Sequence, residues 1–281
     1  MALRFATPVL LPLKKLRVRG GCLDGLSFLW MEITRRCNLT CEHCYADSGP
    51  HLPLTERMTF LNWCRVMGEA RAAGCNRLQF IGGEPTVHPD LVRLLEHATR
   101  VGFRHCEVFT NATLVREGLA QTFEDLGVRV HFSFYSADPA IHDRITGQKG
   151  SFERTVEGIR QLVRRRVRLA AGIILLPENA THLRKTKRFL RSIGVDTIGA
   201  DRVRGVGRGE HFVPRARPSE ELCGQCWSGK LCIDADGDAH PCVFSRSTTV
   251  GNVLEEDLGT IVGGARLRAF RREMFLGDQG G

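Results

Sequence analysis

The sequence predicts an α/β protein built on a parallel sheet of six strands, followed by a small cysteine-rich extension. Short apolar segments alternate with longer amphipathic ones through the first two hundred residues, at a repeat of roughly 30 residues. Six repeats are too few for an eight-stranded barrel, so a partial barrel and an open doubly wound sheet are the two options. After residue 203 the chain becomes rich in glycine, proline and cysteine.

The expected strands are short apolar runs, and Val128–Phe134 alternates strictly between apolar and polar residues. In order they are Leu26–Ile33, Arg77–Ile81, His105–Thr110, Val128–Phe134, Val167–Leu176 and Thr197–Val203. The expected helices between them are Thr59–Ala73, Pro89–Val101, Leu114–Asp125, Ser151–Arg165 and Thr181–Ile193. Proline and serine suit the first turn of a helix, and glycine often follows its end. Parallel strands joined by helices place a functional site at their carboxyl ends.

We expect three segments along the chain. They are an N-terminal segment over residues 1–25, a barrel domain over 26–210 and an extension over 211–281. Closely spaced glycines and prolines at 205–218 indicate a linker between the last two. The N-terminus lacks the apolar centre and cleavage site of a signal peptide. No run reaches the roughly 18 to 20 apolar residues of a membrane span.

Eleven cysteines and a formal charge of +9 limit the possible classes of protein. Seven cysteines form two tight groups, which favours metal sites in a reducing cytoplasm over secreted disulfides. Cys22, Cys64, Cys75 and Cys106 are scattered, and we expect them to be small buried apolar residues. The charge suits acidic partners such as a peptide, an electron-transfer protein or nucleic acid. Because the basic runs lack interleaved aromatic residues, nucleic acid is weakly supported.

Residues 37–44 read Cys-Asn-Leu-Thr-Cys-Glu-His-Cys and directly follow the first expected strand. The three thiolates of Cys37, Cys41 and Cys44 can hold three corners of a four-iron, four-sulfur cube and leave the fourth iron open. Catalytic zinc sites also keep one position free, and zinc too uses closely spaced cysteines. The octet alone is therefore a moderately specific signal for chemistry at an open metal.

The second expected strand ends in Gly82-Gly83-Glu84-Pro85. The octet after strand one and this motif after strand two together resemble the signature of radical S-adenosyl-L-methionine (SAM) enzymes, over about residues 26–210. The resemblance implies a partial (β/α)6 TIM-like barrel with a [4Fe–4S] cluster whose open iron chelates SAM. One electron would then cleave SAM to a 5′-deoxyadenosyl radical.

The same resemblance suggests contacts to the cofactor. Gly82 and Gly83 would let the backbone approach the methionine moiety, with Glu84 beside them. Tyr45 would lie near the adenine, or else pack within its own loop. Ser133 resembles a contact to the ribose or carboxylate.

Two departures from the family pattern concern the third and fourth strands. Asn111 resembles the asparagine of a threonine-asparagine-glycine turn, but Ala112 replaces the glycine. For Asn111 a role in the turn is as plausible as ligand binding. Tyr135 stands where many relatives have aspartate, which puts an acidic contact there in doubt.

The second group reads Cys223-x2-Cys226-x5-Cys232-x9-Cys242, and Gly237 inside it indicates a tight hairpin. Four cysteines can close either an iron–sulfur site or a zinc site. The segment resembles a shortened SPASM or twitch extension, which implies one auxiliary [4Fe–4S] cluster. A further alternative is that Cys242 is a hydrogen donor, as in some epimerases of the family, rather than the fourth ligand.

The resemblance leaves the substrate open. The first hypothesis is epimerisation or oxidation of a sugar or cyclitol centre of a small-molecule glycoside in antibiotic biosynthesis, supported by the few residues before the first strand. The alternative is a maturase of a ribosomally made peptide, whose acidic leader would suit the positive charge. Either needs a flavodoxin- or ferredoxin-type electron donor. A zinc-ribbon protein that binds nucleic acid rests on charge alone, and the motif at 82–85 argues against it.

Overall fold

The computed structural model describes residues 25–54, 56–214 and 218–279. Cys22 and all but the last residue of the expected N-terminal segment lie outside the described residues. Within the described part of the chain, no helix is long and apolar enough to cross a membrane.

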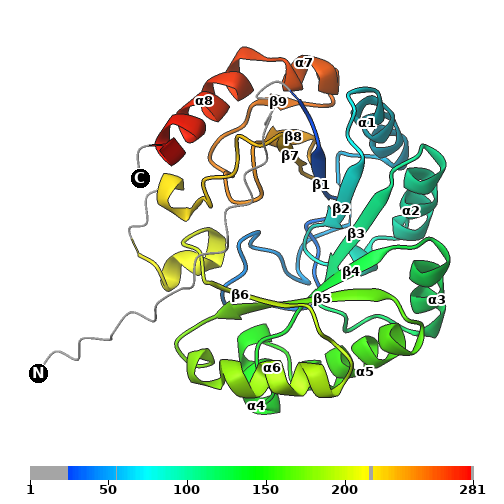
Figure 1. The fold of residues 1–281 in the computed structure, drawn as a ribbon, viewed down its shortest axis with the longest axis vertical. Helices are drawn as coiled ribbons and strands as arrows, with labels where there is room; N and C mark the ends of the chain where they lie inside the picture. The colour runs from blue at the N-terminus through cyan, green and yellow to red at the C-terminus, as the bar shows by residue number, and fades with distance from the viewer. Residues whose placement is uncertain (1–24, 55, 215–217, 280–281) are drawn as a thin grey trace, which may run out of the picture.

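A single nine-stranded sheet organises the chain, in the order β6-β5-β4-β3-β2-β1-β7-β8-β9. Its first six strands are parallel: β1 Phe28–Glu32, β2 Arg77–Ile81, β3 His105–Thr110, β4 Arg129–Ser133, β5 Arg168–Leu175 and β6 Ile198–Arg202. The sheet curves with its helices outside, so the predicted partial (β/α)6 barrel is confirmed (Figure 1). Because the sheet ends at β6 and β9, the barrel is open on one side.

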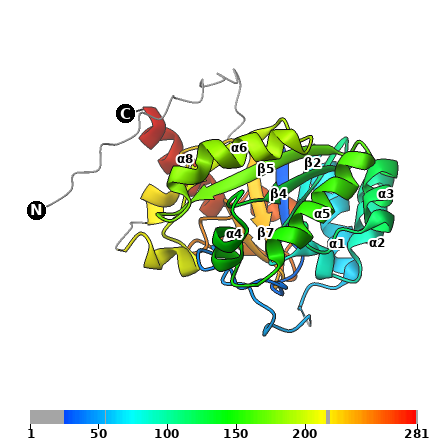
Figure 2. The same cartoon turned by 90° about the horizontal axis from the view of Figure 1, so that it is seen from below.

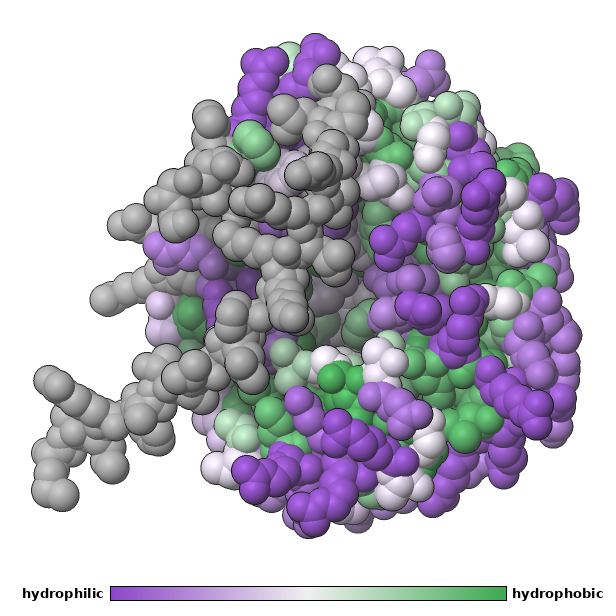
Figure 3. Space-filling view, in the orientation of Figure 1, coloured by the Kyte–Doolittle hydropathy of each residue, from purple (hydrophilic) through white to green (hydrophobic). Residues whose placement is uncertain are grey.

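Five helices alternate with the strands close to their predicted positions. They are α1 Phe60–Ala72, α2 Leu91–Arg100, α3 Glu117–Asp125, α5 Ser151–Arg164 and α6 Leu183–Ser192. They cover the convex face of the sheet (Figure 1), and hydrophilic side chains cover much of their outer rim (Figure 3). The sequence did not predict α4 Pro139–Thr146, a short helix capped by Asp138 and ended by Gly147 in the left-handed conformation.

The main core lies between the sheet and these helices. Met31, Phe80, Val108 and Phe132 belong to it, one from each of the first four strands. Cys75 and Cys106 are buried in the same core, which confirms the expectation for these two, whereas Cys64 is only partly buried against it. The opposite face of the strands is more polar and lines the barrel interior. There Gln79 accepts a hydrogen bond from the Trp30 indole and donates one to Glu107.

The extension continues the barrel sheet. Strand β7, Lys230–Ile233, pairs in parallel with β1, and β8 Asp238–His240 and β9 Gly251–Asn252 follow in antiparallel order. The predicted hairpin joins β7 to β8, with Gly237 at φ +87°. Helices α7 Leu258–Val262 and α8 Ala265–Gln279 complete the extension, and α8 lies on the other side of the molecule from α2 and α3 (Figure 2).

Candidate functional site

The cysteine octet forms a loop directly after β1. Cys37 is buried, whereas Cys41 and Cys44 are partly exposed. The end of α4 holds this loop, because the amide of Thr40 donates to Thr146 O at 3.0 Å and the amide of Glu42 donates to Ile145 O at 3.1 Å. The helix that the sequence did not predict is thus the support on which the octet lies.

The three thiols of the octet are close enough to affect one another. Burial raises the pKa of Cys37 to about 12, with the Glu84 carboxylate as the next cause. Burial also raises the pKa of Cys41, and the neighbouring Cys44 and Cys37 raise it further. Such thiols resist ionisation unless a positive centre lies among them, so this donor set is one that a bound cation would stabilise.

The motif at residues 82–85 backs onto the segment that leads into the octet. The amide of Gly83 donates to Thr34 O at 2.8 Å, and the amide of Glu84 donates to Arg36 O at 2.9 Å. A Cβ on Gly82 would lie 2.3 Å from Thr34 O, and one on Gly83 would lie 2.3 Å from Arg36 O. Glycine is therefore needed at both positions, because the backbone packs against residues 34–36, which lead into the octet. This role is separate from the expected access of SAM to the backbone.

The Glu84 side chain joins the ends of β2 and β3. It is only 1% exposed, and burial raises its pKa. It accepts hydrogen bonds from the Thr110 hydroxyl and the Asn111 amide, each at 2.6 Å. The Asn111 side chain in turn donates to Asn38 Oδ1 at 2.9 Å. Asn111 therefore has the expected turn role and also contacts the octet.

Ala112 follows Asn111 at φ +60°, in the left-handed region that glycine adopts freely. The backbone turn of the family pattern is therefore retained despite the change of residue.

Tyr45 points toward the extension. Its ring packs edge-on against Phe244, with centroids 5.3 Å apart, and Arg246 lies over it at 5.4 Å. Its hydroxyl donates to Glu32 at 3.5 Å. Its contacts are thus with the extension and with β1, and the expected contact with adenine stays a prediction.

Tyr135 is a site residue that the sequence interpretation missed. It lies just past Ser133 at the end of β4, is buried, and packs edge-on against His43 of the octet. Burial raises the pKa of its hydroxyl, and the nearby Cys41 raises it further. The buried amide of Asn179 holds its carbonyl oxygen at 3.0 Å. The sequence showed only that tyrosine replaces the aspartate of many relatives, and this could not predict that Tyr135 packs against the octet.

The second cysteine group spans the start of β7 and the carboxyl end of β8, which lie together in the antiparallel pair. Cys226, Cys232 and Cys242 are buried, and Cys223 is exposed. The neighbouring Cys223 and Cys242 thiols raise the pKa of Cys226, and Cys226 in turn lowers the pKa of Cys223 to about 5. Cys232 lies in β7. Burial raises the pKa of its thiol, and the nearby Glu32 carboxylate raises it further.

A pocket of about 270 Å³ lies beside the segment that follows the octet, near the carboxyl ends of β1 and β2. Its walls come from the end of β1, the octet loop, the motif at 82–83 and the extension. They include Glu32, Thr34, Asp47, Ser48, Gly82, Gly83, Asp234 and Arg246. Arg246 pairs with Glu32 at 2.7 Å, so this wall of the pocket carries an ion pair. Among the residues that the structure describes, Arg246 Nε and Ser48 Oγ are buried without a hydrogen-bond partner.

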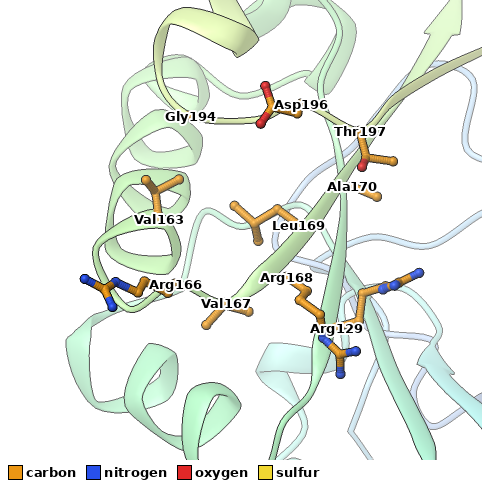
Figure 4. A pocket seen from close by; sticks show the side chains of 10 residues that line it. All are labelled: Arg129, Val163, Arg166, Val167, Arg168, Leu169, Ala170, Gly194, Asp196 and Thr197. Atoms are coloured by element: carbon orange, nitrogen blue, oxygen red, sulfur yellow. The ribbon is translucent and has the colours of Figure 1, made fainter.

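A second pocket, of about 370 Å³, lies far from the cysteines. Figure 4 shows it between α5 and the start of β5, with Arg129 and Arg168 along one side. These arginines begin β4 and β5, so this pocket lies at the end of the strands opposite Ser133 and the octet. This pocket is therefore not part of the candidate site at the octet.

Comparison with known proteins decides the family. Residues 31–190 match the Radical SAM superfamily, and residues 223–279 match the SPASM iron-sulfur cluster-binding domain. The chain belongs to the radical SAM superfamily. Both predicted resemblances are thereby confirmed, since the two matches fall on the octet half and on the second cysteine group.

Three radical SAM relatives illustrate the likeness. AlbA of Bacillus subtilis, the antilisterial bacteriocin subtilosin biosynthesis protein, is 24% identical over 82% of this chain, which spans only 58% of AlbA. SuiB of Streptococcus suis with bound S-adenosylmethionine superposes with a TM-score of 0.72, at 15% identity, over 89% of this chain and 68% of SuiB. BtrN in complex with AdoMet and 2-DOIA gives 0.58, at 17% identity, over 91% and 89%. The structural matches show the fold.

Radical SAM and SPASM domains use a SAM-binding [4Fe–4S] cluster and auxiliary iron–sulfur clusters, and the donor sets here fit both. Three thiols on one loop would leave the open iron that SAM requires, whereas four would close a cluster. Among the described residues, no three metal-binding side chains converge on a point for a single ion. A four-iron cube is wider than one ion, so its ligands need not converge on a point.

Proposed function

We propose that Cys37, Cys41 and Cys44 hold the SAM-binding cluster of this enzyme. The auxiliary cluster would then be held by Cys223, Cys226, Cys232 and Cys242. The pairing of β7 with β1 supports the proposal, because it places Cys232 opposite Trp30, in the strand that leads into the octet. Tyr45 lies near both cysteine groups. Burial and the Glu32 carboxylate are the main causes that raise its pKa, and Cys232 and Cys44 raise it further.

When bound, the reduced cluster and SAM supply a 5′-deoxyadenosyl radical that can abstract a hydrogen atom from a substrate carbon. The chain's own residues shape the chamber around that event. Asn111 directly follows β3 and Ser133 ends β4, at the carboxyl end of the sheet where we expect SAM to bind. Arg246 and Asp234 line the pocket beside the octet, and their charges can orient polar groups of a substrate.

A peptide is the substrate that we favour. AlbA is named for the biosynthesis of a bacteriocin, and SuiB has also been solved with its precursor peptide SuiA bound. The reaction would be a cross-link or an epimerisation. The formal charge of +9 suits both an acidic leader peptide and an acidic flavodoxin- or ferredoxin-type donor.

A glycoside or cyclitol is the second candidate. The pocket beside the octet, at about 270 Å³, is close in size to the roughly 300 Å³ of the smallest ligand pockets. The fold also resembles that of BtrN, which was solved in complex with AdoMet and 2-DOIA. The reaction would be epimerisation or oxidation of an alcohol.

The cluster assignment predicts a specific loss on mutation. Anaerobically reconstituted protein should bind roughly eight iron atoms per chain, four for each cluster. The triple variant C37A/C41A/C44A should bind about half as many and release no 5′-deoxyadenosine from SAM. The matched control is Cys106→Ala, which removes a core thiol whose pKa is raised to about 11 by burial. Cleavage of SAM by the triple variant, or zinc in place of iron, would contradict the assignment.

The reaction type can be read from isotopes. Reduced enzyme is incubated in deuterated water with candidate precursor peptides and, separately, with glycosides. Epimerisation should place one solvent deuterium in the product through an exchangeable thiol. Oxidation should consume one SAM per product without that label.

Cys242→Ala separates the two roles open to this cysteine. If Cys242 is a hydrogen donor, the variant should lose activity but keep its iron. If Cys242 is a ligand, the variant should lose iron from the auxiliary cluster as well. Cys226→Ala serves as the comparison, because its thiol lies between Cys223 and Cys242.

A further inference from the structure

The segment after β6 is bound to the octet by its backbone and by one side chain. The amide of Arg208 donates to Cys44 O at 3.0 Å. The Arg208 guanidinium donates through Nε to Cys41 O at 2.9 Å and through Nη2 to Ser48 O at 2.8 Å, and Nη1 pairs with Asp47 at 2.6 Å. One residue thus contacts four points of the loop.

Gly207 makes this contact possible. It has φ +58°, and a Cβ there would lie 2.5 Å from Tyr45 O and 2.6 Å from Cys44 O. The backbone therefore approaches the octet as closely as sterics allow. The sequence suggested a linker here, but the structure has a 3₁₀ turn, Gly207–His211, against the cysteine loop.

The charge of Arg208 is only weakly neutralised. Two of the acceptors of its guanidinium are neutral carbonyl oxygens. Its one charged partner, Asp47, is 72% exposed, whereas Arg208 is 23% exposed. Water and salt screen an exposed carboxylate, so Asp47 offsets only part of the guanidinium charge beside the octet.

We propose that Arg208 is a positioning residue that fixes the three-cysteine loop, and that its charge raises the reduction potential of the cluster held there. A fixed cation beside the ligands favours the more negative, reduced cluster. The planar guanidinium fork makes several bonds at once, which a lysine cannot reproduce. The electrostatic part rests on the proposed cluster ligands, but it is independent of the substrate.

Two variants separate charge from geometry. In Arg208→Gln the SAM-sensitive electron paramagnetic resonance signal should have a more negative midpoint potential than in wild type. In Arg208→Lys the charge remains, so the midpoint should stay near wild type. The control Asp47→Asn suits the left-handed backbone at this position, φ 50°, and should leave the midpoint unchanged. A fully loaded R208Q protein with the wild-type midpoint would overturn the electrostatic part.

The geometric part is tested without iron. In metal-free R208K, iodoacetamide should label Cys41 and Cys44 several-fold faster than in wild type, because the loop is no longer held. Cys75 and Cys106 in the core are the internal reference, and their labelling should not change. Equal labelling of the loop in both proteins would refute the clamp. If wild type forms no SAM-sensitive cluster, the proposed function fails, yet this labelling comparison still decides the clamp.

Discussion

At the scale of single residues, the sequence predicted the site where a motif demands a residue type. The octet and the motif at 82–85 were found because thiol ligands and close backbone approaches allow few substitutions. Tyr135 and Arg208 escaped notice because their contacts depend on turns after β4 and β6. Many residue types can occupy such a turn, so position in the sequence gives no signal. Their importance follows only from what lies opposite them in the fold.

His142 in α4 makes stability depend on pH. Burial lowers its pKa to about 4, and Asp143 opposes this shift. Its ring packs between Phe134 and Phe152, and Tyr135 donates its amide to Nδ1. The unfolded chain, with a histidine pKa near 6.5, therefore binds the extra proton between about pH 6.5 and 4. Stability is lost as the pH falls through that window, by about 3 kcal/mol at its lower end.

The variant His142→Asn tests this pH dependence. The side-chain oxygen of asparagine can still accept a hydrogen bond from the Tyr135 amide, but asparagine does not titrate. The free energy of unfolding in urea should fall less between pH 7 and pH 4 in the variant than in wild type. Parallel pH curves for the two proteins would show that His142 does not control the acid response.

At the scale of elements, packing between a helix and a turn decides where small residues must stand. In α5, a Cβ on Gly158 would lie 2.0 Å from Ala112 O. This helix therefore rests directly on the turn that carries Asn111. In α1, Gly68 has nothing within 4 Å of its missing Cβ. The two helical glycines look alike in sequence but differ in function.

Gly158→Ala should lower the free energy of unfolding by about 2 kcal/mol, because the added methyl group forces α5 off the turn. Gly68→Ala should raise it by roughly 0.5 to 1 kcal/mol, since alanine is the better helix former. Urea denaturation of both variants measures the difference. A stable G158A protein would mean that the turn can move away at little cost.

At the scale of the whole molecule, the six strands and five long helices followed from periodicity alone. The alternation of apolar runs reports burial, which is a local property of each segment. The pairing of β7 with β1 could not be predicted in this way, because it joins segments about two hundred residues apart. The short helix α4 was missed since eight residues carry too little periodicity. The sequence interpretation therefore treated the extension as a separate segment, whereas its strands belong to the barrel sheet.

A shared sheet predicts that barrel and extension unfold together. Trp63 in α1 reports on the barrel, and Trp227 on the extension. In metal-free protein, variants that keep only one of these tryptophans should show fluorescence transitions with the same urea midpoint. The needed variants are W30F/W227F and W30F/W63F. Two separate midpoints would show that the extension is an independent unit.

The pairing of β1 and β7 also sets an order of events in the cell. The amides of Ser27 and Phe28 donate to Gly229 O across a separation of about two hundred residues. At about 5 to 20 residues per second, a ribosome needs roughly 10 to 40 s to make the chain between them. During that time the edge of β1 next to the octet is unpaired and can join another chain. The β1–β7 pair therefore cannot form until Lys230–Ile233 has been synthesised.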